Sequence, residues 1–345
     1  MPGKDKINEC LTLFSESTEM FKAIRSHGSL NSTYFHFVAD IRSVFLIALM
    51  GLLLIPQLVS AQGRRMEGDL EVTPVRGSVH MMVMEPAGNI GVSAGPDGAF
   101  IIDDQFAPML GRIVLAISKL TDQPIKYVLN THWHGDHTGS NEHFGNMGHI
   151  IIAHDNVRAR MNSDQYHLVF KAGTPPHPEA ALPTITFSDR MTFHFNDDVI
   201  RVLHVPNAHT DGDAIYYFEK ADVMHTGDAF INRGFPLIDI ASGGSIKGQI
   251  EATNKMLELV GPDTIIIPGH GPLADRARMI EIRDMLVAAR GAIVKLLDQG
   301  KSLEQILAAK PLADLEEKWG QGFVKSKLFV RIVYQSETGD WQLPQ

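Results

Sequence analysis

Apolar residues follow two spacings along this chain, and each spacing predicts one kind of element. Short runs rich in β-branched and aromatic residues predict strands, and they lie at residues 79–84, 90–103, 125–130, 150–154 and 184–203. Apolar residues three and four apart predict helices, and these segments lie at residues 110–120, 155–161, 247–259 and 278–297. We expect Asp155 to be the N-cap of the second of these helices, since its carboxylate can accept a backbone N–H.

Two further segments follow a different pattern. A polar, proline-rich loop at residues 175–183 precedes the strands of 184–203, and it is either an inert surface loop or a lid over a substrate. Beyond about residue 300, apolar segments predict a helical extension that packs on the main domain. Its aromatic side chains are Trp319, Phe323 and Phe329. We expect these side chains to be core or a dimer surface rather than a binding site.

The N-terminal region has the pattern of a secretory signal. Residues 44–55 are a run of apolar side chains after Arg42, and small residues at 59–61 supply a cleavage site after Ala61. The run is shorter than the roughly twenty residues that span a bilayer. A buried core helix and an uncleaved anchor are the alternative interpretations. We therefore expect residues 1–61 to be an extension with a signal peptide, and the mature protein to be periplasmic or secreted, without stable membrane insertion.

Composition narrows the class of protein. With 44% hydrophobic and 21% charged residues in 345, the chain is typical of soluble globular proteins. We expect one large domain at 62–300 and the extension at 301–345. The net charge of −9 argues against a nucleic-acid partner and leaves a small-molecule substrate. The only cysteine, Cys10, lies in the segment expected to be removed, so the mature chain has neither disulfides nor thiolate ligands.

Four metal-capable side chains lie within six residues, directly after the strand predicted at 125–130. They are His132, His134, Asp136 and His137. In an extended backbone, residues two apart point the same way, so His132 and His134 can bind one ion. Asp136 and His137, beyond the flexible Gly135, can turn toward a second ion. Imidazole and carboxylate without thiolate suit Zn²⁺, with Fe and Mn as alternatives.

Three more candidates follow apolar runs further along the chain. They are His209, Asp228 and His270. Each follows a short predicted strand, where α/β sheets place their functional loops. His204 and His225 lie within strand runs and are predicted to be structural. His143, His167 and His177 are secondary candidates, the first for support of the ligands and the other two for contact with substrate.

With these residues, the chain resembles the metallo-β-lactamase-fold hydrolase superfamily, whose signature is His-x-His-x-Asp-His followed by separate His, Asp and His ligands. The resemblance covers about residues 70–275. It implies an α/β fold, a four-layer αββα sandwich with two metal ions at one edge of its sheets. It also implies two ligand trios and one bridging carboxylate: His132, His134 and His209; Asp136, His137 and His270; and Asp228.

The family also has an acid at the end of an early strand that supports the histidine loop. Asp103 and Asp104 both match this position, and we favour Asp103. Arg233, five residues after Asp228, is the best candidate to pair with a substrate carboxylate, although an exposed, solvated arginine is the alternative.

The ligand set departs from that of the best-known β-lactamases of this superfamily. Those enzymes carry Cys where Asp228 stands, and usually Arg where His137 stands. The full His and Asp set is more similar to that of thioester hydrolases, lactonases and RNA-processing members. The family name therefore leaves the substrate open.

The resemblance implies a hydrolase with two zinc ions, in which a metal-bridging hydroxide attacks a carbonyl. Asp136 would orient this hydroxide and pass a proton to the leaving group. We expect a β-lactamase-like enzyme acting on a cyclic amide such as a β-lactam, because a periplasmic address disfavours glutathione thioesters and RNA. Lactone, ester or thioester hydrolysis is the alternative, and a non-catalytic periplasmic metal-binding protein is the third hypothesis.

Overall fold

The computed structural model describes residues 70–341 of the chain. Contacts divide the chain into two compact units, Met1–Arg65 and Met66–Gln345, and all of the described residues belong to the second unit. The predicted signal peptide, its cleavage after Ala61, and Cys10 lie outside the described residues.

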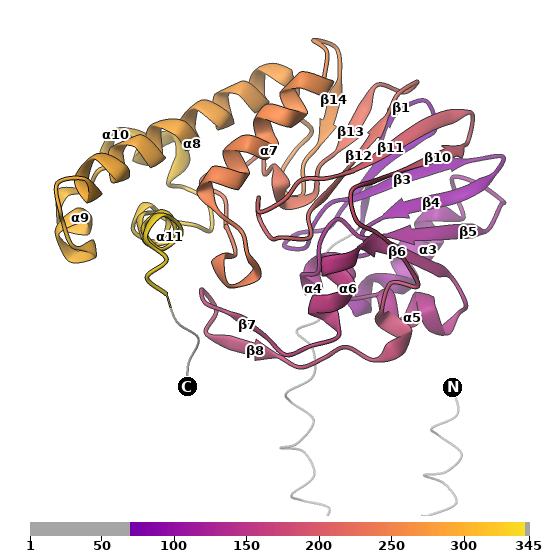
Figure 1. The fold of residues 1–345 in the computed structure, drawn as a ribbon. Helices are drawn as coiled ribbons and strands as arrows, with labels where there is room; N and C mark the ends of the chain where they lie inside the picture. The colour runs from indigo at the N-terminus through magenta and orange to yellow at the C-terminus, as the bar shows by residue number, and fades with distance from the viewer. Residues whose placement is uncertain (1–69, 342–345) are drawn as a thin grey trace, which may run out of the picture. The chain divides into compact units, whose positions relative to one another are not determined.

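The first sheet has seven strands and begins as a series of antiparallel hairpins (Figure 1). In spatial order its strands are β1 (Glu71–Arg76), β2 (Val79–Val83), β3 (Ile90–Gly95), β4 (Gly98–Ile102), β5 (Ile125–Leu129), β6 (Ile150–His154) and β9 (Ile185–Phe187). Strands β1 to β4 pair antiparallel, whereas β4, β5, β6 and β9 run parallel to one another. The parallel strands therefore end at one edge of the sheet.

The second sheet has five strands. Three of them are followed by loops that carry predicted ligands. Its strands are β10 (Arg190–Phe195), β11 (Asp198–His204), β12 (Ala214–Phe218), β13 (Val223–His225) and β14 (Ile265–Ile267). Only the last pair, β13 and β14, is parallel. A separate hairpin, β7 (Gln165–His167) with β8 (Ala172–Thr174), stands apart from both sheets between β6 and β9 in the sequence.

An aromatic core joins the inner faces of the two sheets. Phe100 of β4 makes an edge contact with Phe193 of β10 at 5.0 Å between ring centroids, and it also meets Phe218 of β12 at 6.3 Å. Edge-to-face contacts of this kind contribute stabilisation beyond the apolar area that they bury. Phe195 and Tyr127 complete the same cluster. The alternation of side chains along each strand thus supplies one inner apolar face per sheet.

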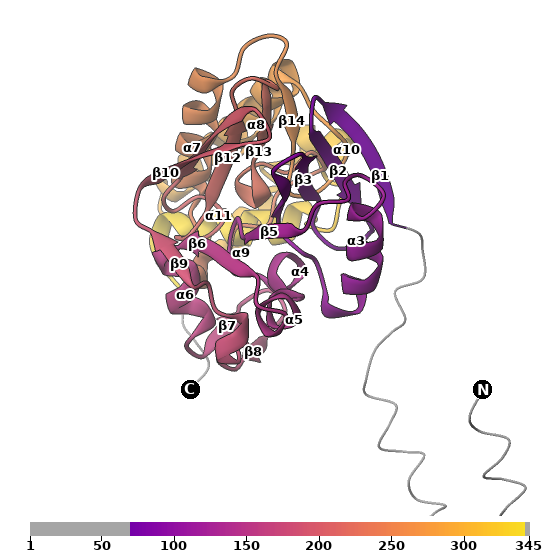
Figure 2. The same cartoon turned by 90° about the vertical axis from the view of Figure 1, so that its right-hand side faces the viewer.

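Helices cover the two outer faces, so the layers run helix, sheet, sheet, helix (Figure 2). The first sheet is covered mainly by α3 (Leu110–Ile117) and α5 (Asn141–Asn146), with α4 (Gly135–Thr138) and α6 (Asp155–Met161) at its strand ends. The second sheet is covered by α7 (Ile246–Leu259) and α8 (Arg276–Leu297). This confirms the predicted four-layer αββα sandwich.

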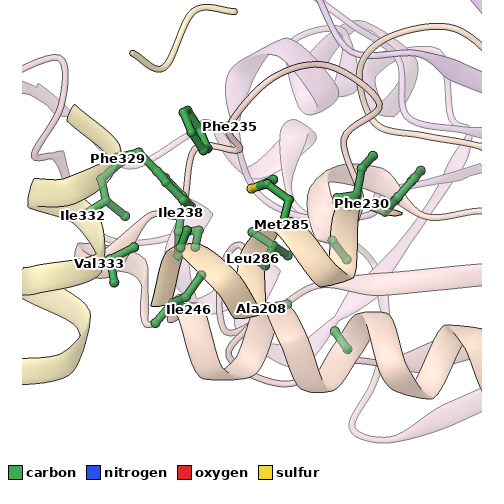
Figure 3. Packing of buried hydrophobic residues seen from close by; sticks show 14 of the residues in the cluster. Ala208, Phe230, Phe235, Ile238, Ile246, Met285, Leu286, Phe329, Ile332 and Val333 are labelled. Atoms are coloured by element: carbon green, nitrogen blue, oxygen red, sulfur yellow. The ribbon is translucent and has the colours of Figure 1, made fainter. Parts of the chain in front are cut away.

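The C-terminal segment continues the outer helical layer of the second sheet. It forms α9 (Leu303–Ala309), α10 (Ala313–Trp319) and α11 (Ser326–Thr338). Figure 3 shows Phe329, Ile332 and Val333 of α11 facing Ile238 and Ile246, within one hydrophobic cluster that includes α7 and α8. The predicted helical extension is therefore present.

The aromatic residues of the extension divide between the core and the surface. Trp319 and Phe329 are buried, as expected of core residues, whereas Phe323 is 65% exposed. Within residues 70–341, no helix has the length and apolar content needed to cross a bilayer.

Several local details differ from the sequence-based prediction. The run at 90–103 is a hairpin rather than one strand, because the chain turns between β3 and β4. The N-cap of α6 is His154, whose ring accepts the N–H of Asn156 at 3.2 Å, and Asp155 is the first helical residue. The segment before the proline-rich loop forms the β7–β8 hairpin, which no strand pattern had predicted.

Candidate metal centre

The predicted ligands come from the ends of strands in both sheets and meet in one site. The loop after β5 carries His132 and His134, and the short helix α4 that follows carries Asp136 and His137. Strands β11, β13 and β14 are followed by the remaining candidates, which are His209, Asp228 and His270. The structure brings all seven of these side chains together.

Three imidazoles form the first group. Nδ1 of His134 lies 3.1 Å from Nε2 of His132 and 2.9 Å from Nε2 of His209. All three side chains are buried, and their ligand atoms converge on one point. Each ring thus presents one nitrogen inward and the other outward.

The outward nitrogens of two of these rings are occupied by hydrogen-bond acceptors. Nε2 of His134 donates to the carboxylate of Asp239 at 2.9 Å, and Nδ1 of His209 donates to the carbonyl of Leu237 at 2.8 Å. A neutral imidazole carries only one N–H, so the inward nitrogens of both rings present lone pairs. Two lone pairs 2.9 Å apart repel each other unless a cation lies between them.

The third ring is fixed in the same way through Asp103. The hydroxyl of Thr131 donates to Oδ2 of Asp103 at 2.8 Å, so its oxygen is free to accept from Nδ1 of His132 at 3.0 Å. Nε2 of His132 therefore also presents a lone pair. The other oxygen of Asp103 accepts the backbone N–H of Thr131 at 2.7 Å. Asp103 has a left-handed φ of 65°, and these bonds hold its carboxylate against the start of the loop that carries His132 and His134.

The second group contains two imidazoles and one carboxylate, from His137, His270 and Asp136. Nε2 of His270 lies 3.2 Å from Oδ2 of Asp136 and 3.4 Å from Nε2 of His137. Nδ1 of His137 in turn donates to Asp103 at 2.7 Å, so one carboxylate supports residues of both groups. Asp228 lies between the groups. Its Oδ1 is 3.3 Å from His137, and its Oδ2 is 3.5 Å from His270 and 3.7 Å from His209.

Burial keeps two of the three rings of the first group, His132 and His209, neutral. It lowers the pKa of His209 to about 4, against the opposing effect of Asp228, and it lowers the pKa of His132 well below its usual value together with the neighbouring imidazoles. These rings are therefore unprotonated at neutral pH, as metal ligands must be. Three converging ring nitrogens, two of them on rings that are neutral at neutral pH, form a preorganised cation site.

In the second group, in contrast, the carboxylates favour positive charge on their neighbours. Burial by itself would lower the pKa of His137, but Asp136, Asp228 and Asp103 outweigh it and raise this pKa well above its usual value. The same competition, with Asp228 and then Asp136 as the main opposing groups, raises the pKa of His270 to about 9. Burial likewise raises the pKa of Asp228, and His270 and His137 reverse that effect and lower it. A divalent cation supplies the positive charge that these carboxylates require.

Two glycines allow the backbone to approach the ligands closely. A Cβ atom at Gly88 would lie 2.2 Å from Cε1 of His137, and one at Gly269 would lie 2.0 Å from Oδ1 of Asp228. Both distances are far shorter than any real contact, so only glycine fits at either position. The backbone of residues 88 and 269 therefore forms part of the wall around the second group.

The other predicted residues lie further from the two groups. Arg233 pairs with Glu85 through both terminal guanidinium nitrogens, Nη1 and Nη2, in a partly exposed ion pair. Asp104 accepts the backbone N–H of Ser140 at 2.9 Å, so it supports the start of α5.

The remaining histidines have varied surroundings. His225 is buried and hydrogen-bonds to backbone, and His204 stacks on His154 at 3.7 Å between centroids. His143 is exposed, and His177 is partly buried. His167 lies beside the first group, with its Nδ1 3.9 Å from Asp239 and its ring stacked on Trp133 at 4.9 Å.

Asp239 is the residue that the sequence pattern did not indicate. It fixes the ring of His134, and its carboxylate also accepts the hydroxyl of Ser242 at 2.6 Å. The only local signal is that of an N-cap, an Asp before a short helical turn. Asp213, which accepts the backbone N–H of both His209 and Thr210, supports the third ligand loop in a similar way.

The donors fit divalent metal ions. Nitrogen and carboxylate oxygen in two adjoining groups, joined by one carboxylate, are the donor set that zinc accepts. Fold and site together define a protein of the αββα class with a candidate metal centre at the edge of its sheets. The chain belongs to the metallo-beta-lactamase superfamily, whose family model matches residues 85–270.

Curated relatives of the chain carry several names. The chain is 24% identical over 184 residues to the lactamase-like protein aptB of Emericella nidulans, covering 53% of this chain and 50% of that protein. It is 24% identical over 228 residues to a hydroxyacylglutathione hydrolase of Rhodospirillum rubrum, covering 62% of this chain and 80% of that protein. The chain is 22% identical to an atrochrysone carboxyl ACP thioesterase of Aspergillus chevalieri, and the match covers 61% of this chain and 60% of that protein. The chain thus spans half the length of the first of these relatives.

Solved structures share the fold at low sequence identity. The sec-alkylsulfatase Pisa1 of Pseudomonas sp. superposes with a TM-score of 0.61 at 18% identity, over 79% of this chain and 51% of that one. The DIM-1 metallo-beta-lactamase superposes with a TM-score of 0.53 at 17% identity, over 64% of this chain and 99% of that chain. The fold of the described residues is therefore that of the superfamily.

Proposed function

We propose that this protein is a dinuclear zinc hydrolase that cleaves activated carbonyl compounds. The observation that carries the proposal is the convergence of three imidazole nitrogens beside a second group of two imidazoles and a carboxylate, with Asp228 between the two groups. His132, His134 and His209 would hold one ion, and Asp136, His137 and His270 the other. Bound ions of this kind polarise a carbonyl oxygen and lower the pKa of water toward neutrality.

The protein's own groups then orient the reaction. Asp228 fixes the distance between the two groups, because its two oxygens face different imidazoles. Asp136 is the proton-transfer group, since its carboxylate is 27% exposed whereas the other site carboxylates are buried. Its Oδ2 faces His270, which leaves Oδ1 to take a proton from the attacking water and return it to the leaving group. Burial of the imidazoles keeps bulk water away from the ligands.

Two substrate classes follow from different observations. The family relationship favours a cyclic amide such as a β-lactam. The names of two relatives, a hydroxyacylglutathione hydrolase and an acyl carrier protein thioesterase, favour a thioester or ester. The complete His and Asp ligand set, with Asp228 rather than Cys, supports the second class as well.

A substrate panel tests the proposal. Zinc-loaded protein would be assayed on a chromogenic cephalosporin, a lactone series and a thioester series, with and without a chelator. We expect chelator-sensitive turnover of at least one class, and a loss of about 10²–10⁴-fold in Asp136→Asn. Asp189→Asn, a change at an exposed carboxylate, is the matched control. Metal uptake with no turnover of any class would instead identify a metal-binding protein.

We also propose that the protein is exported to the periplasm or secreted, on the basis of the apolar run and small residues before Ala61. Intact-mass measurement of the protein from the exported fraction is the test. A chain that begins at Gln62 supports export with cleavage, and an uncleaved chain in the cytosolic fraction contradicts it.

A further inference from the structure

One of the five candidate imidazole ligands lacks the side-chain support that the other four have. The outward nitrogens of His132, His134, His209 and His137 meet Thr131, Asp239, the carbonyl of Leu237 and Asp103, respectively. Within residues 70–341, Nδ1 of His270 has no such partner, and its Nε2 alone faces the other ligands. The direction of this ring therefore depends on how the backbone holds residue 270.

The backbone on both sides of His270 is bound by one residue of the first sheet, Asn89. Its side-chain Nδ2 donates to the carbonyl of Pro268 and to that of Gly271, each at 2.8 Å. Its backbone N–H donates to the carbonyl of Gly269 at 2.7 Å. Three hydrogen bonds from a single residue thus enclose the loop that carries the ligand.

The other hydrogen bonds of this loop come from its own sheet. The N–H of Gly269 donates to a carbonyl in the loop after β13, and the carbonyl of His270 accepts an N–H from the same loop, each at 2.9 Å. Strand β13 is the neighbour of β14, which precedes His270. These bonds cannot set the distance from His270 to ligands that follow the first sheet. Asn89 can, because β3 of the first sheet begins at the next residue.

Asn89 is itself fixed in place. It is 1% exposed, and its backbone carbonyl accepts a hydrogen bond from Nε2 of the buried His225 at 3.2 Å. Two carbonyl oxygens face its amide group, so the NH₂ end must point toward the loop of His270. The opposite orientation of the amide would place Oδ1 against both carbonyls, and a buried carbonyl without a donor is costly.

The turn that carries Asn89 also reaches the rest of the second group. Gly88 donates its N–H to the carbonyl of Asp136 at 3.2 Å, and it lies against the ring of His137. Residues 88 and 89 therefore connect α4 with the loop of His270. Across this connection, Nε2 of His270 lies 3.2 Å from Oδ2 of Asp136.

From these contacts we infer that Asn89 is a positioning residue for the second ligand group. It holds the backbone around His270 so that the ring faces Asp136 and His137. The inference rests on the proposed function, because it concerns the second of the two proposed ions. It predicts that the two zinc affinities depend on Asn89 unequally, since among the described residues no imidazole of the first group hydrogen-bonds to Asn89.

Zinc titration tests this without any turnover. The two dissociation constants would be measured by competition with a chromophoric chelator, in the unmodified protein and in Asn89→Ala. We expect one constant to rise by about 10- to 100-fold and the other to stay unchanged. Asn196→Ala is the matched control, because Asn196 is also buried and its Nδ2 donates to Ser93 and to the carbonyl of Gly98. This control should lose stability and keep both zinc affinities.

Asn89→Asp separates positioning from charge. The carboxylate has the volume of the amide, but it would face two carbonyl oxygens without a donor. Its negative charge by itself favours a cation. We therefore expect weaker binding of the second ion in this variant despite the added charge. Because Asn89→Asp preserves the packing, it also decides the question if Asn89→Ala does not fold.

Three results would overturn the inference: an equal loss of zinc affinity in Asn89→Ala and Asn196→Ala, unchanged or tighter binding of the second ion in Asn89→Asp, or an unmodified protein that binds a single ion. Failure of the hydrolase proposal gives a different result. If two ions bind and no carbonyl substrate is turned over, that proposal fails, and a selective loss of the second ion in the Asn89 variants still supports the role of Asn89.

Discussion

At the scale of single residues, the account depends on which nitrogen of each imidazole carries a proton. Asp239, Leu237 and Thr131 each occupy the outward nitrogen of one ring in the first group. The inward nitrogens are left as lone pairs, and burial prevents those of His132 and His209 from being protonated at neutral pH. The residues that support the ligands therefore determine the metal affinity as much as the ligands do.

Asp239→Ala should weaken zinc binding at the first group, because the ring of His134 loses the acceptor that fixes its tautomer. We expect a decrease in affinity of about 10- to 100-fold, measured by competition with a chromophoric chelator. Asp239→Asn should recover part of the loss, since an amide oxygen can still accept from Nε2. Equal affinity in Asp239→Ala and in an Asp189→Ala control would contradict this role.

Gly88→Ala should disturb the second group, since the added methyl would overlap the ring of His137. We expect zinc content to fall from about two ions per chain toward one, measured by elemental analysis, and turnover to fall with it. Gly291→Ala in α8 is the control, because its Cβ would meet no atom within 4 Å. This control should instead stabilise the protein by about 1 kcal/mol. Unchanged zinc content in Gly88→Ala would argue against the assignment of His137.

The seven ligand candidates could be predicted from the sequence because they lie in one motif and directly after apolar strands. Their roles as ligands stay a prediction until metal is bound. Asp239 could not be predicted, since its loop has no periodicity, and only the fold brings it to His134. Arg233 shows the opposite case. Its sequence position suggested a substrate contact, yet the fold places Glu85 against its guanidinium.

At the scale of elements, strong apolar runs gave reliable predictions and short irregular segments did not. The predicted helices over α7 and α8 are present, as is the C-terminal extension. Strand β1 contains Pro74 and no clear alternation, and β7 and β8 have three residues each, so neither pattern separates them from loop. Such strands form because their neighbours pair with them, which is tertiary information.

Phe329→Ala should destabilise the domain, because the ring of Phe329 packs α11 against the rest of the domain. Phe329 is fully buried and stacks on Phe235 at 4.7 Å with an interplanar angle of 17°. We expect the free energy of unfolding to fall by about 3–5 kcal/mol in urea denaturation. Phe323→Ala, at an exposed ring of the same extension, should change it by less than about 0.5 kcal/mol. A small effect at Phe329 would mean that α11 is not part of the cooperative unit.

At the scale of the whole molecule, both sheets contribute candidate ligands to one site. His132 follows the first sheet and His209, Asp228 and His270 follow strands of the second, so ions bound as proposed would join both halves of the sandwich. The fold class and the family, predicted from the motif and its context, are confirmed by the layers and by the family match.

Because ions that bind only the folded state stabilise it, removal of metal should lower the midpoint of thermal unfolding. At a free zinc concentration of about 1,000 times Kd, one site contributes about 4 kcal/mol. We expect dialysis against a chelator to lower the midpoint and zinc to restore it, whereas His132→Ala should show a smaller shift than the unmodified protein. Identical melting curves with and without chelator would contradict tight binding between the sheets.

The most direct test of the central claim is anomalous diffraction at the zinc edge from crystals grown with zinc. The account predicts two peaks about 3.5–4 Å apart, one bound by His132, His134 and His209 and the other by Asp136, His137 and His270, with Asp228 between them. A single peak outside these groups, or none in a protein that still turns over its substrate, would contradict it.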